Sequence, residues 1–493
     1  MGASRVSTVI LSSAITIGFL ADQLLRAPAW GVNVALAGGL LAAAGIATSR
    51  ERGRSWPWLG SVFFASMWAI RDAQPLLAAD LLAALSLASL PLLRESDVAL
   101  PGAGLVELAA TPLRAARAIT VGTVGFGEYL RSGREPRAAG QRSRAIAVGA
   151  LLAVPLLLVF GSLFASADPV FGATVSSFYA GTLGPLVSHA ISITALAWAS
   201  AGYLWHVVKP PSPAGPALTL PAVGGLQVLT PVLATVVLFA VFIGVQVGTL
   251  FGGAALVQTT TGLTFAQYAR GGFFQLLFAA ALVLPLVYFA PAAAQPIDRR
   301  TAALLRALLW IQLGLTALVL ASALWRMGLY VRTYGLTEDR VNGTAVMLWI
   351  AATLAVFAFT VVRGRPGAAF GSLVAAVIAL ASLNIANPQA TIAQYNLAHQ
   401  NDREIDLAHL AQLGGDAVPI LAARIQLVPE AERCRLITDV RGRYLPEVGD
   451  WRGWNLARVR AHKAAAGLLA AEACRAAGHP ERVGVTPGTR GAS

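Results

Sequence analysis

Hydrophobic residues along this chain gather into long blocks that show no alternation of apolar and polar positions. A block of about 20 apolar residues crosses the ~30 Å hydrocarbon core of a bilayer when it forms a helix. A helix also satisfies its own backbone hydrogen bonds, as the lipid interior requires. We therefore predict about eleven transmembrane helices, at residues 6–25, 29–48, 56–71, 74–93, 145–165, 186–208, 227–250, 271–290, 302–325, 344–362 and 367–385.

The composition supports a membrane protein and argues against a nucleic-acid-binding one. Hydrophobic residues make up 56% of the chain and charged residues only 12%, against about 25% charged residues in soluble proteins. The net charge is +13, but the arginines lie in the short segments between apolar blocks, where membrane topology places them. We therefore expect a lipid bilayer as partner and no nucleic acid.

Basic residues also predict the orientation of the chain. They concentrate in segments 50–54, 94–144, 299–300 and 363–365, which share one side of the membrane if the N-terminus is cytoplasmic. Because cytoplasmic loops carry the excess of basic residues, we predict a cytoplasmic N-terminus and an extracytoplasmic C-terminus. Arginine greatly outnumbers lysine, as in GC-rich bacteria, which points to a bacterial cytoplasmic (inner) membrane. The first block is alternatively a signal peptide ending at Ala27-Pro28-Ala29.

The expected fold is all-α: a polytopic membrane helix bundle with a small helical extracytoplasmic C-terminal domain. Segment 98–144 carries an apolar stripe (Leu105, Leu108, Leu113 and Ile119) followed by arginines, typical of a helix lying on the inner leaflet; a solvated loop is the alternative. The predicted parts are transmembrane helices 1–4 (1–97), a cytoplasmic Arg-rich interfacial segment (98–144), transmembrane helices 5–11 (145–385), a helical C-terminal head (386–477) and a disordered tail (478–493).

The predicted head contains several short helices. Leu407, Leu410 and Leu413 recur at helical spacing, a second stretch covers 416–427, a third helix begins after Pro429, and a last one runs near 455–477. Between the last two helices lies a turn with two tryptophans, at positions 451 and 454. They either close a small core, the favoured interpretation, or lie against lipid headgroups.

Motifs for cofactor chemistry are absent from the sequence. It has no phosphate-binding glycine loop, no Cys-x-x-Cys pair, no Gly-x-Ser-x-Gly turn and no histidines at metal-ligand spacing. We expect no cofactor and no metal ion. Cys434 and Cys474 both lie in the predicted extracytoplasmic part, where an oxidising environment would allow one disulfide between them.

Polar residues gather at the predicted outer ends of the helices. One interpretation is a structural network that ties helix ends together and docks the head. The other is an outward-facing pocket for an anionic or sugar-bearing ligand, free or lipid-linked, in which Arg270, Arg332 and Arg340 bind oxygens and Asp168 serves as acid, base or metal ligand. The candidate outer-face cluster comprises Asp168, Arg270, Arg332, Tyr334, Arg340, Tyr395, Asn396, Asp80 and Arg71.

The predicted spans 186–208 and 227–250 each contain one polar residue of interest. His189 and Gln246 either bond a neighbouring helix or line a transport path, and the first role is the commoner one. A transporter is therefore the least favoured function.

Several segments together resemble the bacterial membrane proteins of the domain-of-unknown-function (DUF) 4173 family, which is related to the 4153 family. They span roughly 160–420 and comprise Phe164–Phe171, Tyr268–Phe273, Tyr334–Arg340, Tyr395–Leu397, Asp406–Leu410 and Asp416–Pro419. The resemblance implies no reaction. It does imply that Asp168, Arg270, Tyr334, Arg340, Tyr395 and Asn396 lie in the family's motifs.

From these patterns we expect an integral membrane protein that binds, senses or scaffolds at the extracytoplasmic face of the bacterial envelope, without catalysis. The alternative is an envelope enzyme that acts on a lipid-linked sugar or phosphate. The sequence does not identify the protein partners.

Overall fold

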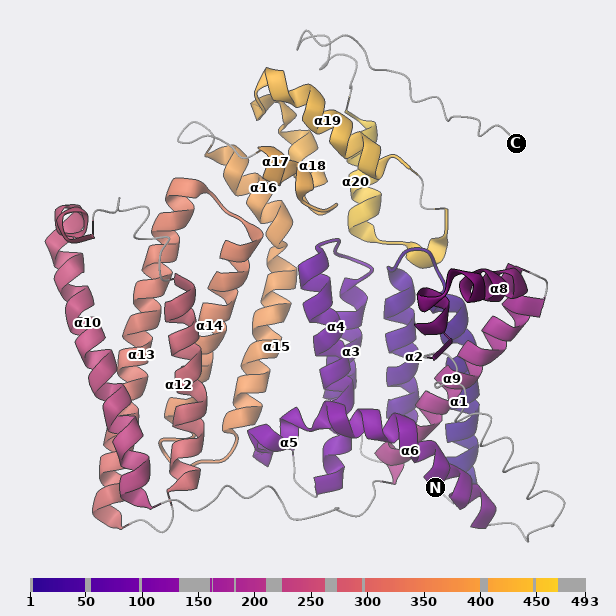
Figure 1. Cartoon of the computed structure of the whole chain (residues 1–493), viewed down its shortest axis with the longest axis horizontal. Helices are drawn as coiled ribbons and strands as arrows, with labels where there is room; N and C mark the ends of the chain where they lie inside the picture. The colour runs from indigo at the N-terminus through magenta and orange to yellow at the C-terminus, as the bar shows by residue number, and fades with distance from the viewer. Residues whose placement is uncertain are drawn as a thin grey trace. The chain divides into compact units, whose positions relative to one another are not determined.

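The computed structural model is helical throughout the residues that it describes (Figure 1). It separates into two compact units. Unit 1 comprises Met1–Ala69, Ala78–Thr219 and Asp450–Trp454, and unit 2 comprises Ile70–Leu77, Leu220–Gly449 and Asn455–Ser493. The described residues are 3–48, 55–96, 100–132, 160–161, 163–180, 183–209, 224–261, 273–294, 298–399, 407–446 and 449–468.

Unit 1 is built on α1, α2, α3, α6 and α9, with most of α4. Helix α9 packs along α1 and α6, and α2 packs on α1 and α3. Small residues allow close approach: a side chain at Gly45 of α2 would overlap the buried ring of Trp58 on α3. The helices of this unit are α1 (Ala3–Leu25), α2 (Val32–Thr48), α3 (Trp56–Met67), α4 (Gln74–Ser89), η2 (Leu90–Ser96), η3 (Leu100–Gly102), α5 (Leu105–Ala109), α6 (Thr111–Ser132), α8 (Pro169–Ala180) and α9 (Leu183–Val208).

The Arg-rich segment forms helices over its described residues rather than a loop. In Figure 1, α5 and α6 run across the direction of α2, α3 and α4. Helix α6 buries Ala118 and Phe126 against α9 and leaves Leu113 and Val121 exposed. The Trp198 indole of α9 donates to the backbone oxygen of Ile119 at 3.0 Å. Helix α6 thus carries both an exposed apolar strip and arginines, and its place on the inner leaflet stays a prediction.

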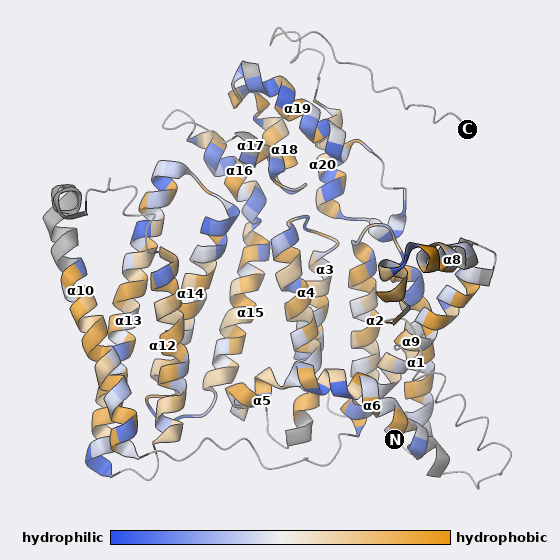
Figure 2. Cartoon of the chain, in the orientation of Figure 1, coloured by the Kyte–Doolittle hydropathy of each residue, from blue (hydrophilic) through white to orange (hydrophobic). Residues whose placement is uncertain are grey.

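Unit 2 contains five long apolar helices and a set of short ones. Figure 2 shows the long helices as mostly hydrophobic and the short ones as mixed. The long helices are α10 (Gly225–Thr261), α12 (Phe273–Ala293), α13 (Arg299–Tyr334), α14 (Glu338–Phe359) and α15 (Ala368–Ala386). The short ones are α16 (Pro388–Ala398), α17 (Leu407–Gln412), α18 (Val418–Ala423), η5 (Ile425–Leu427), α19 (Glu430–Tyr444) and α20 (Leu456–Ala466), while η6 (Trp451–Gly453) belongs to unit 1.

Local signals set the ends of these helices. The Asp298 carboxylate caps α13 by accepting from the backbone N–H groups of Arg300 and Thr301. Gly335 has a φ of 83° and ends α13, as a residue without a Cβ readily does. Asn387, also at positive φ, separates α15 from α16 and caps the latter through its side chain. These turns place α14 beside α13 and start the short helices directly after α15.

The short helices of unit 2 share a small core of their own. Leu397, Leu410, Leu421 and Leu436 are among its almost fully buried members. The bounds of α17 and α19 match the expected helices, and α20 occupies the described part of the predicted last helix. The predicted disordered tail lies outside the described residues.

The predicted spans agree with the structure in kind, although the predicted number is not confirmed. Eight helices of the described residues are long and apolar enough to cross a membrane, and α2 is a shorter apolar helix. Helix α3 has only 12 residues, and most of block 145–165 lies outside the described residues. The chain is thus a multi-pass membrane protein by length and composition of its helices.

Candidate functional site

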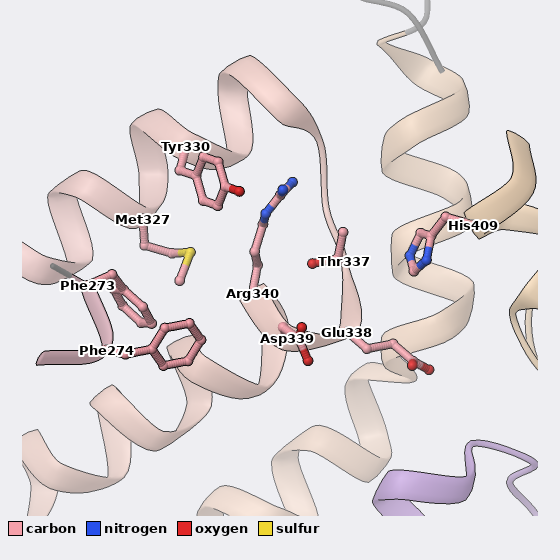
Figure 3. A pocket seen from close by; sticks show the side chains of 9 residues that line it. All are labelled: Phe273, Phe274, Met327, Tyr330, Thr337, Glu338, Asp339, Arg340 and His409. Atoms are coloured by element: carbon pink, nitrogen blue, oxygen red, sulfur yellow. The ribbon is translucent and has the colours of Figure 1, made fainter. Parts of the chain in front are cut away.

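A cavity of about 530 Å³ lies in unit 2 where the ends of several helices meet (Figure 3). Helices α12 and α14 begin there, and α13 ends there. Helix α17 contributes one histidine. The lining residues are Phe273 and Phe274 of α12, Met327 and Tyr330 of α13, Thr337 with Glu338, Asp339 and Arg340 at the start of α14, and His409 of α17.

The guanidinium of Arg340 is held in place within this cavity. It lies over the ring of Tyr330, 4.0 Å from the centroid, and donates a hydrogen bond to the backbone oxygen of Gly335. A cation over an aromatic face is attracted by the ring's electron density. Figure 3 shows the Arg340 side chain between Tyr330 and Thr337, with His409 on the far side of Thr337. The cation is therefore positioned before any ligand arrives.

The turn between α13 and α14 is fixed from outside by α16. The side-chain amide of Asn396 accepts from the backbone N–H of Leu336 and donates to its oxygen, both at 2.8 Å. Glu338 accepts a 2.7 Å hydrogen bond from the Gln389 side chain. Glu338 and Asp339 occupy the first turn of α14, where the helix dipole favours negative charge. The polar wall of the cavity is thus anchored on two sides.

The apolar wall comes from the ends of two predicted spans. Phe273 and Met327 are buried, whereas Phe274 is 65% exposed. Gly343 of α14 makes room for this wall, since a Cβ there would come within 3.2 Å of the Phe273 ring. One wall of the cavity therefore offers aromatic and thioether surface, and the other offers one cation, two carboxylates, a hydroxyl and an imidazole. Such a cavity can hold an amphiphilic molecule.

Four other residues of the predicted outer cluster lie near the end of α13 and the start of α14 but do not line the cavity: Arg332, Tyr334, Tyr395 and Asn396. Tyr334 is half exposed and packs on Tyr330, with ring centroids 5.0 Å apart. Arg332 is exposed. Tyr395 stacks on His399 at 4.3 Å, one residue before Asn396. Among the described residues of the predicted cluster, only Arg340 lines the cavity.

Arg71 belongs to a second polar cluster of unit 2. Its guanidinium binds the Asp416 carboxylate at 3.2 Å and the backbone oxygen of Asn384. The neighbouring Asp72 accepts from the backbone N–H of Gly415 at 3.1 Å and lies 3.7 Å from Arg458. Segment 70–77 is thereby tied to α15 and to the short helices.

Burial dominates the electrostatics of this second cluster. It raises the pKa of Asp72, with a further upward push from the Asp416 charge, while Gly415 and Arg458 oppose the change. Burial and the nearby Asp72 charge raise the pKa of Tyr444 to about 12. These groups form a polar network that ties segment 70–77 to α15 and to the short helices of unit 2.

Two of the remaining predicted site residues, Asp80 and Asp168, belong to unit 1. Asp80 is fully buried within α4. Asp168 is exposed and caps α8, accepting from the backbone N–H groups of Val170 and Phe171 at 2.7 and 3.1 Å, which is a local structural role. Arg270 lies outside the described residues.

The predicted pairing of the two cysteines stays a prediction. Cys434 lies on α19, whereas Cys474 is outside the described residues. Within the described part of the chain, no group of three or more His, Cys, Asp or Glu residues could hold a metal ion.

His189 and Gln246 each bond to a neighbouring helix. Gln246 of α10 accepts from Ser322 of α13 at 2.7 Å. His189 of α9 lies 2.5 Å from the buried Asp22 carboxylate of α1, which also accepts from Ser192 at 2.5 Å and from Arg26 at 2.6 Å. Asp22 and Arg26 are one turn apart, a spacing that pairs opposite charges on a helix.

Sequence reasoning missed most of the cavity. Phe273, Phe274 and Met327 look like ordinary span residues, and His409 lies far along the chain from all three. A weak signal was available at the end of α13, where Tyr330 and Tyr334 flank Arg332 in the sequence.

Comparison with known proteins gives a family without an assigned reaction. The family model described as "Domain of unknown function (DUF4153)" matches residues 58–423, most of the chain and all residues of the cavity lining. No curated protein and no solved structure matches the chain. The chain therefore belongs to the DUF4153 family.

Proposed function

We propose that this membrane protein binds a lipid-linked sugar in the cavity lined by Arg340. The observation that carries the proposal is the division of the cavity into two walls. Phe273, Phe274 and Met327 form an apolar wall at the ends of predicted spans, and the start of α14 forms a polar one. An acyl chain fits the first wall and a polar headgroup the second.

The charges of the polar wall favour a sugar over a phosphate. Arg340 donates hydrogen bonds, whereas Glu338 and Asp339 accept them when ionised. Sugar hydroxyls both donate and accept, so they can use all three side chains. A phosphodiester accepts only, and it would be repelled by the two carboxylates. Tyr330 adds an aromatic face and a hydroxyl beside the cation.

The position of Phe274 supports entry of the ligand into the cavity from the bilayer. It lies in the first turn of α12, one of the helices long and apolar enough to span a membrane, and its side chain is 65% exposed. An exposed ring at the boundary of hydrocarbon and headgroups suits a ligand that stays in its leaflet. The protein would then bind its ligand laterally rather than from water.

The distribution of arginines supports an extracytoplasmic cavity in a bacterial inner membrane. Arg299 and Arg300 begin α13, and the cavity lies at its other end. Arg363 and Arg365 follow α14, also at the end away from the cavity. By the positive-inside tendency the cavity faces outward. The arginines of segment 50–54, two predicted spans after the N-terminus, favour a cytoplasmic N-terminus. The segments that resemble the 4173 family support a narrower grouping with that family.

Native mass spectrometry of the detergent-purified protein tests the binding. The probes are a glucosyl-diacylglycerol and phosphatidylglycerol, titrated separately. We expect the glycolipid to bind more tightly, and Arg340→Gln to weaken it about tenfold, the effect of losing one charge-assisted hydrogen bond. Arg332→Gln is the matched control, because Arg332 is exposed nearby and does not line the cavity.

Equal binding of the glycolipid by wild type and Arg340→Gln would contradict the proposed site. Tighter binding of phosphatidylglycerol than of the glycolipid would contradict the preference for a sugar headgroup. The cavity would then still be a lipid-binding site. Conversion of the glycolipid to a product of different mass would establish instead an enzyme acting on a lipid-linked substrate.

A further inference from the structure

Three exposed tryptophans gather at one end of unit 1. Trp30 follows α1 and is 47% exposed, while Trp451 and Trp454 belong to the segment Asp450–Trp454 and are 65% and 45% exposed. Trp30 also packs on Trp68, with ring centroids 5.2 Å apart. The two later tryptophans are therefore not the core of the head, contrary to the favoured expectation.

The segment Asp450–Trp454 is firmly seated on the turn between α1 and α2. The backbone oxygen of Trp454 accepts from the N–H of Val32 at 2.8 Å. The Arg452 guanidinium donates to the backbone oxygen of Gln23 and is paired with Asp450 at 2.6 Å. Gly31 lies so close beneath that a Cβ there would overlap the Trp454 oxygen. These contacts fix both exposed indoles relative to the end of α1.

The end of α1 is where a lipid-facing surface stops. Leu11, Ile15 and Phe19 recur at four-residue spacing and are 47%, 56% and 53% exposed, which gives α1 an open apolar stripe. In a helix long and apolar enough to span a membrane, this stripe faces lipid. Trp30 and the segment Asp450–Trp454 lie just beyond the C-terminal end of this apolar helix.

We propose that Trp30, Trp451 and Trp454 insert into the lipid headgroup layer, so that the chain makes a second membrane contact far beyond its last predicted span. The indole ring suits this layer, because its apolar body meets acyl chains while its N–H meets water and headgroups. Arg26 and Arg452 lie beside these tryptophans, and each is paired with an aspartate of unit 1. The occupant is lipid, and not a protein partner.

Tryptophan fluorescence in vesicles tests this contact. The full-length protein and the double variant Trp451→Ala/Trp454→Ala are reconstituted in phosphatidylcholine with and without acyl chains brominated near the headgroup. The difference spectrum between the two proteins isolates the two indoles. We expect bromolipid to quench this difference emission roughly twofold or more, and aqueous iodide to quench it weakly.

Trp310→Ala is the control for a lipid-facing tryptophan outside the patch, since it is 43% exposed on α13. Strong iodide quenching without bromolipid quenching would overturn the proposal and leave a water-facing or partner-binding patch. If the double alanine variant fails to fold, Trp451→Phe/Trp454→Phe removes the same emission and keeps the apolar surface. Quenching by bromolipid would then support insertion into the headgroup layer, and quenching by iodide alone would contradict it.

Discussion

The Oδ2 atom of Asp416 accepts a 2.7 Å hydrogen bond from the backbone N–H of Asp72, more than three hundred residues earlier in the chain. The other carboxylate oxygen of Asp416 pairs with Arg71 at 3.2 Å. Neither side chain is much exposed: the values are 4% for Asp416 and 15% for Arg71. A single carboxylate thus holds the loop between α3 and α4 against the short helices of unit 2.

Replacing Asp416 should loosen this attachment. Asp416→Ala leaves the Arg71 guanidinium and the Asp72 N–H without their acceptor in a site that water hardly reaches. We expect unfolding free energy to fall by about 3 kcal/mol, the range for breaking a buried ion pair. Thermal unfolding in detergent and the rate of trypsin cleavage measure it. Asp439→Ala on the exposed side of α19 is the control, and equal effects of the two would contradict the clamp.

Asp72 should give the same cluster a pH dependence. Its pKa is raised in the folded protein, chiefly by burial, so the unfolded chain loses this proton first as pH rises. The group therefore stabilises the fold below its unfolded pKa of about 3.9, and this contribution is lost as pH rises through the folded pKa.

Melting temperatures of wild type and Asp72→Asn, measured across this pH window, isolate the Asp72 contribution. Wild type should lose stability relative to the variant as pH rises. A relative gain with rising pH would show that Arg458 and Gly415 outweigh burial at Asp72.

The contact between α2 and α3 depends on one glycine. A Cβ at Gly45 would overlap the ring of Trp58, which is 1% exposed. We expect Gly45→Ala to cost about 1–3 kcal/mol through overpacking. Gly39→Ala has nothing within 4 Å of the added atom and should be neutral or stabilising by about 1 kcal/mol through helix propensity. Denaturant titration of both variants compares them, and a shared loss of stability would rule out the specific overlap.

Asp22 should couple α1 to α9. Its buried carboxylate accepts from Ser192 and lies 2.5 Å from the His189 ring. A double-mutant cycle of Asp22→Asn and Ser192→Ala should show a coupling energy of about 1 kcal/mol, typical of hydrogen bonds between membrane helices. Ser12→Ala is the control, because the Ser12 hydroxyl donates to the backbone oxygen of Val9 within α1. The control cycle combines Asp22→Asn with Ser12→Ala. A coupling energy near zero in both cycles would mean that packing alone holds α1 against α9.

Hydropathy predicted the spans because a bilayer demands a minimum apolar length, but it did not predict where helices end. Block 302–325 corresponds to α13, which continues to Tyr334 and stops only at Gly335 with its positive φ. Because α13 continues past the apolar block, Tyr330 lies where the Arg340 guanidinium can stack over its ring. Helix geometry does not end at the membrane boundary, so apolar length alone misses this part of the site.

The tryptophans of the head show a second limit of sequence reasoning. Two large aromatic residues in a short turn favour a core role, yet aliphatic side chains such as Leu410, Leu436 and Ile437 fill the core of the short helices. Trp451 and Trp454 are exposed instead. Which large residues a small core takes is decided by packing between segments distant in sequence, and no local pattern records it.

Photo-crosslinking from Phe274 tests the lipid-binding cavity most directly. A benzoylphenylalanine placed at 274 is activated in intact cells, and the attached lipid is identified by mass spectrometry. Phe278 is the matched control, equally exposed one turn along α12 and absent from the cavity lining. We expect position 274 to capture a glycolipid selectively, with loss of that product in Arg340→Gln, and position 278 to capture the general lipid mixture. The same lipid mixture at both positions, unchanged by Arg340→Gln, would contradict the account.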